Sequence, residues 1–363
     1  MEQTRWHRGA WHRALGPILV LGLGHAAAAS DLVDQRGRHH HLDGTAQRVV
    51  FLPMPHPSTY MAIDETARHI VGMNPSSAVA LRAGILSRIF PEARAIATDI
   101  TQGTGFVPNV ESILALRPDA VFQWASLGDE LLEVLDRVGL RTIGVRCCSQ
   151  ADLETYSGIM GQLAGKEDRA AEMMRRQAVR RAEIAQAMAG LPDAERPRIV
   201  YLRRFTDALS VAGAGSYNDD YIRLAGGANA AEGPGSTAAT VTLEQVLAWN
   251  PEVILLGNFD TAIPADIYGD PRWAGVAAVR ARRVYRMPLG GYRWDPPNQE
   301  SALTWTWIAL LLHPGRGGFD LRADMRDWYR FLYRHELTEE EADGILFTAA
   351  NHESAGYDRM LRR

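Results

Sequence analysis

The sequence lacks several features that often announce a function. Lysine occurs once in 363 residues, at Lys166, and because arginine carries nearly all the positive charge we attach no function to its abundance. No G-x-S-x-G or H-E-x-x-H motif is present, and the histidines do not have the spacing of a three-ligand metal centre. We therefore predict a protein that is not an enzyme and that needs no cofactor and no metal bound by its own side chains.

Cysteine is almost absent. The only two, Cys147 and Cys148, are adjacent, and neither follows the N-terminal segment, so a lipid-anchored cysteine is excluded there. A disulfide between neighbours is unusual because its geometry is strained. Two interpretations stay open: a pair of small buried thiols at the end of a strand, or a redox or ligand-contact role.

Long apolar runs are also missing. The run of residues 14–23 is apolar but too short to cross a bilayer. It follows three arginines and precedes an Ala-rich cleavage site, and this pattern predicts a signal peptide over residues 1–29. Its removal takes a net +2 from a formal charge of −4 and leaves −6, which argues against a nucleic-acid partner. We expect a freely diffusing periplasmic protein, most simply a monomer.

A long helix is predicted in the middle of the chain, over residues 166–191. Good helix formers dominate it, no proline interrupts it, and acidic residues lead while arginines follow, as the helix dipole favours. About 25 helical residues span about 38 Å, roughly the width of a domain. The segment is therefore interpreted as a rigid connection between two halves.

The two halves contain a repeated unit. VPNVESILALRPDAVF (107–122) and VTLEQVLAWNPEVILL (241–256) match at Glu111 and Glu244, and also at a Leu–Ala pair, a proline and an acid. Each predicts a helix, a break at proline and a buried strand. The fold class is accordingly α/β, with two Rossmann-like lobes joined by one long rigid helix and a ligand cleft between them. The predicted boundaries are 30–165 for the N-terminal lobe and 192–363 for the C-terminal lobe with a helical extension.

Candidate ligand-binding residues lie where strands of the two lobes end, because open α/β sheets bind ligands there. They combine aromatic rings, which offer stacking area, with guanidinium groups, which offer forked donors to oxygen. The candidates are His56, Trp124, Arg203, Arg204, Tyr292, Arg293 and Trp294. The run His39–His41 is not a candidate metal site, since consecutive strand residues point to alternate faces.

The sequence resembles the periplasmic binding proteins of ABC importers for iron–siderophores and cobalamin. The resemblance rests on GRHHHLDGTAQRVV, on the repeated segments, on VAGAGSYNDDYIRLAGGAN and on RWAGVAAVRARRVYRMP, and it covers residues 31–312. It implies two α/β lobes on a rigid helix and a small hinge motion. It also implies that Glu111 and Glu244 dock onto arginines of a dimeric membrane permease.

The resemblance implies a receptor that captures a metal chelate and delivers it to an ABC permease. An Fe(III)–siderophore is the first expectation, with cobalamin, haem or another metal complex as alternatives. The segment WYRFLYRHEL (328–337) extends beyond the best-known members and leaves the ligand open. His56 or Tyr292 is an additional candidate for completing the metal's coordination. A periplasmic metal-centre enzyme or chelatase on the same fold is the alternative in a different class.

Overall fold

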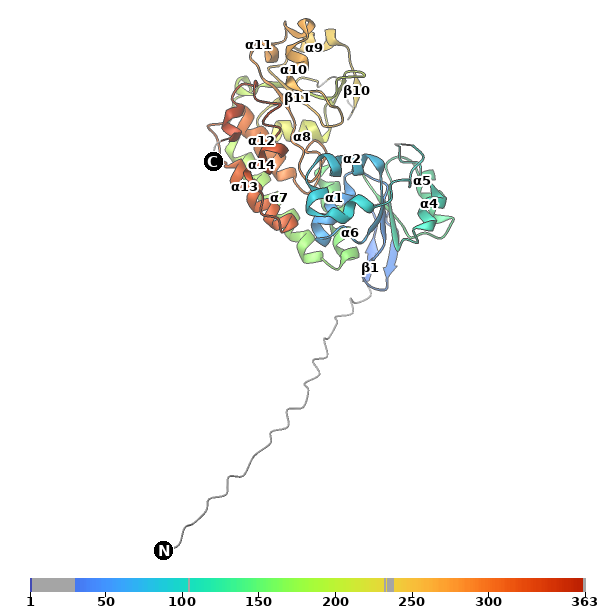
Figure 1. Ribbon diagram of the computed structural model, residues 1–363. Helices are drawn as coiled ribbons and strands as arrows, with labels where there is room; N and C mark the ends of the chain where they lie inside the picture. The colour runs from blue at the N-terminus through green and yellow to red at the C-terminus, as the bar shows by residue number, and fades with distance from the viewer. Residues whose placement is uncertain (2–29, 104, 232, 234–237, 362–363) are drawn as a thin grey trace.

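The computed structural model describes residue 1 and residues 30–103, 105–231, 233 and 238–361. Two α/β lobes lie at an angle to each other, with a group of helices along one side (Figure 1). Apart from Met1, the predicted signal peptide lies outside the described residues. Among the described helices, none combines the length and apolar character that a membrane crossing requires.

The N-terminal lobe contains a four-stranded sheet in the order β4-β3-β5-β6, and all three pairings are parallel. Strand residues are buried almost without alternation, as a sheet covered on both faces requires. Its strands are β3 (Val49–Phe51), β4 (Ile70–Met73), β5 (Ala120–Trp124) and β6 (Thr142–Val145). Its helices are α1 (His56–Asp64), α2 (Pro75–Ala83), α3 (Leu86–Ile89), α4 (Val110–Ala115), α5 (Glu130–Asp136) and α6 (Gln150–Ala164).

The C-terminal lobe has a mixed sheet in the order β10-β8-β7-β11-β12, with β9 also paired to β7. The central pairings of β7 with β11 and of β11 with β12 are parallel, so their carboxyl ends lie at one edge. The strands are β7 (Arg198–Arg204), β8 (Ser210–Val211), β9 (Ala228–Asn229), β10 (Ala239–Thr240), β11 (Val253–Leu256) and β12 (Val284–Arg286). The helices are α8 (Tyr217–Leu224), α9 (Leu243–Trp249), α10 (Pro264–Tyr268), α11 (Ala277–Arg280), α12 (Ser301–Leu312), α13 (Leu321–Tyr333) and α14 (Glu339–Ile345).

The repeat detected in the sequence has the same structure in both lobes. In each copy an arginine at the start of a strand, Arg48 or Arg198, donates side-chain hydrogen bonds to carbonyls at the end of the repeat helix. In each copy the backbone N–H of that arginine also donates to the acid of the repeat, Asp119 or Glu252. The two lobes are therefore built on one local plan, and Glu111 and Glu244 lie in the first turns of α4 and α9.

The connecting helix is α7 (Glu167–Ala187), which is shorter than the predicted 166–191. Gly190 adopts a φ of 70°, a left-handed conformation that glycine takes at little cost, and the chain turns there. Helix α7 is fastened to the second half by buried Gln177, which donates to the carbonyls of Asn298 and Gln299 at 3.0 and 3.1 Å. The predicted fold class, two α/β lobes on a long helix, is confirmed.

The helical extension at the C-terminus also contacts the N-terminal lobe. Arg334, after α13, forms an ion pair with Glu65 after α1 at 2.6 Å, and Arg169 of α7 lies 3.4 Å from the same carboxylate. One buried apolar cluster runs through both lobes, α7 and the extension. Such a shared core is consistent with a stiff hinge, while the exact domain boundaries remain a prediction.

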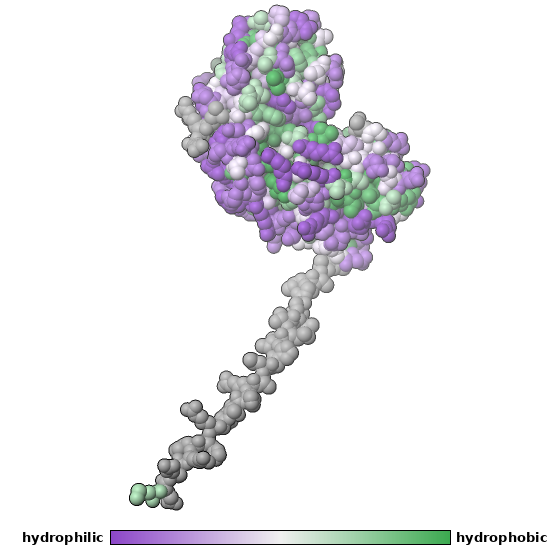
Figure 2. Space-filling model, viewed as in Figure 1, coloured by the Kyte–Doolittle hydropathy of each residue, from purple (hydrophilic) through white to green (hydrophobic). Residues whose placement is uncertain are grey.

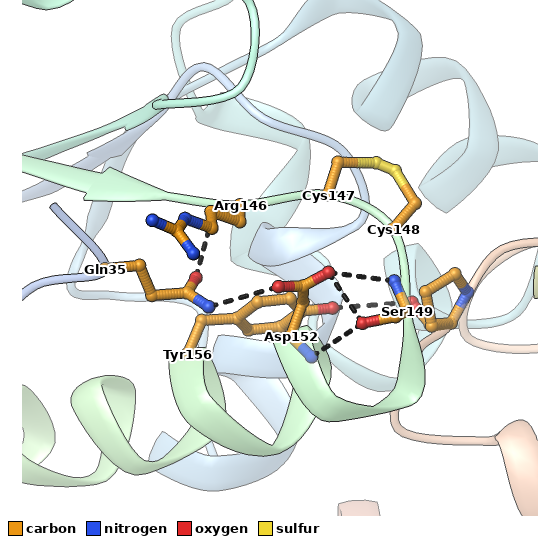
Figure 3. Close-up of a disulfide and its surroundings, with 8 residues drawn as sticks. Gln35, Arg146, Cys147, Cys148, Ser149, Asp152 and Tyr156 are labelled. Atoms are coloured by element: carbon orange, nitrogen blue, oxygen red, sulfur yellow. Dashed lines mark hydrogen bonds between the residues drawn. A yellow bond between two sulfur atoms is a disulfide. The ribbon is translucent and has the colours of Figure 1, made fainter.

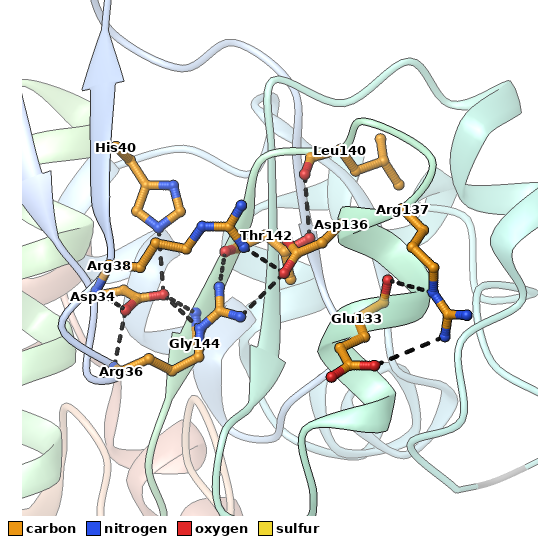
Figure 4. Close-up of polar contacts among 10 residues, drawn as sticks. All are labelled: Asp34, Arg36, Arg38, His40, Glu133, Asp136, Arg137, Leu140, Thr142 and Gly144. Carbon is orange, nitrogen blue, oxygen red and sulfur yellow. Dashed lines mark hydrogen bonds and ion pairs between the residues drawn. The ribbon is translucent and has the colours of Figure 1, made fainter.

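The N-terminal lobe also carries a hairpin, in which β1 (Ser30–Val33) pairs antiparallel with β2 (His39–Leu42). Buried Asp34 attaches it to the sheet, accepting hydrogen bonds from the Arg36 side chain and the Gly144 backbone, both at 2.9 Å, and from His40 at 3.3 Å (Figure 4). Burial alone raises the pKa of Asp34, but these bonds outweigh it and hold the pKa well below its usual range. Of the three consecutive histidines, only His40 is buried, so they do not converge on one site.

Asp34→Asn is expected to lower the free energy of unfolding by about 2 kcal/mol at pH 7, because charge-assisted bonds are lost. Because the pKa of Asp34 is lower in the folded than in the unfolded state, its ionised carboxylate stabilises the fold above the unfolded-state pKa of about 4. This stabilisation is lost as the pH falls toward the folded-state pKa. The difference between variant and wild type should therefore shrink below about pH 4. Urea unfolding at pH 7 and pH 3 checks this, with Asp43→Asn, whose side chain is 89% exposed, as the control. Equal losses in both variants would contradict the role of Asp34.

Candidate ligand-binding cleft

A cavity of about 340 Å³ lies between the two lobes. The surface is indented between the lobes, and hydrophobic residues are exposed at the indentation (Figure 2). From the N-terminal lobe, the wall consists of Met54, Phe106, Trp124, Leu127, Cys147 and Cys148. From the C-terminal lobe, it includes Tyr201, Arg203, Tyr217, Asn218, Phe259, Tyr292, Asp295, Pro296 and Pro297. A more open hollow of about 650 Å³ runs along α6 and α7, and none of the predicted ligand residues lines it.

The topology explains why the cavity is there. Met54, Trp124 and Cys147 follow or end the parallel strands β3, β5 and β6, and Arg203 and Phe259 come from the ends of β7 and β11. The carboxyl edges of both sheets thus face one space, the usual ligand position in α/β folds. The prediction of a cleft at these strand ends agrees with the structure.

Arg203 is the cationic group of the wall. Its guanidinium lies over the Phe259 ring at 4.9 Å from the centroid, and among the described residues no carboxylate pairs with it. Neighbouring Arg204 is exposed, lies 3.9 Å from Asp207 and is not in the wall. The prediction that Arg204 contacts ligand is therefore corrected, because successive strand residues point to opposite faces.

The tyrosine hydroxyls of the wall are already used inside the protein. Tyr201 donates to Asp295 at 2.9 Å, Tyr217 donates to Ser301 at 2.8 Å, and the Tyr292 oxygen accepts from Arg293 at 3.1 Å. Asp295 is buried; burial raises its pKa, and the bonds from Asn258 and Tyr201 lower it only in part. The rings of these tyrosines thus offer area to a ligand more readily than their hydroxyls offer hydrogen bonds.

Two predicted residues are structural instead of exposed to the cavity. Trp294 is fully buried, and its indole N–H donates to Glu300 at 2.6 Å. Arg293 is buried between the rings of Phe259 and Tyr292 and donates to the carbonyls of Asn258 and Ser76, at 2.9 and 3.3 Å. Ser76 belongs to the other lobe, so Arg293 joins the lobes beside the cavity and does not line it.

His56 also lies away from the cavity surface. It is fully buried, and its ring centroid is 4.2 Å from that of Tyr156 and 5.0 Å from that of Trp124. Burial lowers the pKa of His56 to about 3, and among the described residues neither ring nitrogen has a hydrogen-bond partner. The idea that His56 completes a metal's coordination sphere is therefore corrected: it is a neutral ring supporting Trp124 from behind.

Sequence reasoning missed part of the wall. Cys147 is half-buried and Cys148 is exposed, and both line the cavity with adjacent sulfurs, which contradicts the interpretation as two buried thiols. Their position directly after β6, at the same sheet edge as Trp124, was the available signal. Phe259 and Asp295 also belong to loops that follow strands, but nothing in their local sequence distinguishes them from core residues.

A family model described as a periplasmic binding protein matches residues 87–289, more than half of the chain. The chain belongs to the periplasmic binding protein family. Proteins of this family bind a small ligand in the periplasm and serve the permease of an ABC transporter, and the resemblance seen in the sequence is confirmed.

Relatives of this periplasmic binding protein bind different ligands. A periplasmic solute-binding protein of Veillonella parvula is 28% identical, with a TM-score of 0.82 over 89% of this chain and 98% of that one. The molybdate-binding protein MolA of Haemophilus influenzae is 25% identical over 64% of this chain and 72% of its own sequence. Its molybdate-bound structure has a TM-score of 0.74, with 24% identity, over 85% and 99% of the two chains. The haem-binding protein RhuT of Roseiflexus shares the fold alone, at 20% identity and a TM-score of 0.59 over 75% and 99%.

Proposed function

We propose that this periplasmic binding protein captures a preformed metal chelate, in the first place an Fe(III)–siderophore, and delivers it to an ABC permease. The observation that carries the proposal is the cavity wall: aromatic rings from both lobes and one guanidinium, Arg203, that no carboxylate among the described residues neutralises. Rings supply stacking area for an organic shell, and the guanidinium supplies charge and forked donors for its anionic oxygens.

Molybdate is the second candidate, and the similarity to MolA favours it. A bare oxyanion needs several hydrogen-bond donors, because burying a charge without partners is costly. The Tyr201 and Tyr217 hydroxyls already donate to Asp295 and Ser301, so Arg203 remains as the main charged donor. This arrangement suits a larger anion with an organic surface better than a small one.

Titration of the purified protein tests the proposal by following tryptophan fluorescence, since Trp124 lies in the wall. The panel comprises Fe(III)–siderophores of the catecholate and hydroxamate classes, cobalamin, haemin and molybdate. Saturable binding of an Fe(III)–siderophore supports the proposal. Binding of molybdate alone replaces it with the second candidate. Tightly held metal without any organic shell would instead favour the enzyme or chelatase hypothesis.

Arg203→Ala is expected to weaken binding of an anionic chelate about 10- to 100-fold, because a hydrogen bond to a charged group contributes about 1.5–3 kcal/mol. Arg204→Ala is the matched control: it removes the same charge one residue later, outside the wall. Isothermal titration calorimetry of both variants gives the comparison. Equal dissociation constants for the two variants would remove Arg203 from the site.

We further propose that Glu111 and Glu244 are the contacts to the permease. Both side chains are exposed, and each lies on the repeat helix of its own lobe, in the first turn. The duplicated placement suits a partner that itself presents two equivalent surfaces, as a permease dimer does. An acid in a first helical turn also stabilises the helix, and that role is compatible with docking.

A further inference from the structure

Sulfur is concentrated on one wall of the cavity. Cys147 and Cys148, the only cysteines of the chain, both line it after β6, and the Met54 thioether lines it after β3. Trp124 ends β5, which lies between β3 and β6 in the sheet. The wall that the N-terminal lobe offers to a ligand is therefore soft and polarisable, whereas the charged group, Arg203, belongs to the other lobe.

The backbone holds the cysteine pair in place on both sides. Before it, the Arg146 N–H donates to the Gln35 side chain at 2.8 Å; after it, Ser149 and Asp152 form the capping box of α6 (Figure 3). Figure 3 also shows the two sulfurs on the opposite side of the chain from this polar network. The sulfurs thus face the cavity from a loop whose ends are fixed.

We propose that the Cys147–Cys148 pair is a redox-gated binding site for a thiophilic metal or metalloid centre in the cleft. As a disulfide, the pair has no thiolate and contributes only apolar surface to the cavity wall. As a dithiol, it presents two adjacent soft ligands, which suit As(III) and soft metal ions. Among the described residues no group of three His, Cys, Asp or Glu side chains forms a metal site, so the remaining ligands come from the cargo or from water.

Both steps balance with a dithiol reductant. The reductant transfers two electrons and two protons to the Cys147–Cys148 bond, yielding two thiols and the disulfide of the reductant. Arsenous acid, As(OH)₃, then exchanges two hydroxyl groups for the two sulfurs; each thiol proton leaves with one hydroxyl as water.

Arsenite is the probe that tests this site, and the test does not depend on the identity of the natural chelate. The full protein is reduced, freed of reductant under anaerobic conditions and titrated by calorimetry, with Trp124 fluorescence as a second readout. Reduced wild type is expected to bind one equivalent, whereas oxidised wild type binds none. Cys147→Ser and Cys148→Ser, shown to be folded by circular dichroism, are each expected to bind at least 100-fold more weakly.

Met174→Leu is the matched control because Met174 lines the open hollow along α6 and α7, outside the cavity, and the variant keeps both thiols; it should bind arsenite like wild type. Arsenite binding by oxidised protein, retained affinity in either serine variant, or an equal loss in Met174→Leu would overturn the assignment. Failure of this test leaves the chelate-binding proposal standing. Conversely, if no siderophore of the ligand panel binds, the arsenite result still stands.

Discussion

A protein carrying both Glu111→Arg and Glu244→Arg is expected to bind its ligand with wild-type affinity and to support no measurable uptake. Both glutamates are exposed on the repeat helices α4 and α9, and neither lines the cavity. Replacing an acid by arginine at a contact with a basic partner exchanges attraction for repulsion, and two such exchanges cost several kcal/mol. Transport of radiolabelled chelate into cells or proteoliposomes measures the loss, and calorimetry measures the affinity.

The control for this experiment is the double variant Glu167→Arg with Glu340→Arg. These glutamates are also exposed and also lie in first turns, of α7 and α14, so the charge change and the loss of helix-dipole stabilisation are matched. Uptake by this control should remain near wild type. If both double variants lose uptake equally, net charge and not docking explains the effect; if Glu111→Arg with Glu244→Arg loses affinity, the glutamates act in ligand binding.

Trp294→Ala is expected to lower the free energy of unfolding by about 3–5 kcal/mol, because a fully buried indole is removed. The substitution also removes a donor from buried Glu300, which additionally accepts from Tyr333 at 2.6 Å and from the Gly291 backbone at 2.9 Å. Burial raises the pKa of Glu300, so each lost hydrogen bond makes its charged form less favourable. Denaturant unfolding at pH 7 gives the value.

Trp294→Phe keeps an aromatic ring at this position but removes the indole N–H that donates to Glu300. It should cost about 1–3 kcal/mol, the penalty for a buried polar group that loses a partner. Trp249→Phe, at a half-buried tryptophan of α9, makes the same chemical change and should cost less. If Trp294→Phe matches Trp249→Phe, the Trp294–Glu300 bond contributes nothing measurable. If folded Trp294→Phe has a wild-type chelate affinity, the corrected position of Trp294 outside the wall is supported.

The architecture was predictable because it is encoded locally and twice. The repeated helix, proline and strand around Glu111 and Glu244 are periodic patterns that short segments specify, and both copies fold accordingly. The end of α7 was misplaced because two more good helix formers, Met188 and Ala189, follow the last helical residue, Ala187, before the chain turns at Gly190.

The site was harder to predict, because contact with a cavity depends on neighbours distant in sequence. Trp124, Arg203 and Tyr292, which we predict to contact ligand, line the cavity, whereas Trp294 is held in the core by Glu300 and His56 is enclosed by aromatic rings. Their local sequences differ little: all lie at or after the ends of strands and carry large side chains. Glu300 itself gave no signal, because a single acid before a helix is usually exposed.

The position of the metal in a complex tests the central claim most directly. Crystals of the protein with the bound metal chelate would be measured at the absorption edge of the metal. We expect one anomalous peak inside the cavity between the lobes, with Trp124 and Arg203 on opposite sides of the complex. A peak outside that cavity, for instance in the open hollow along α6 and α7, would contradict the account.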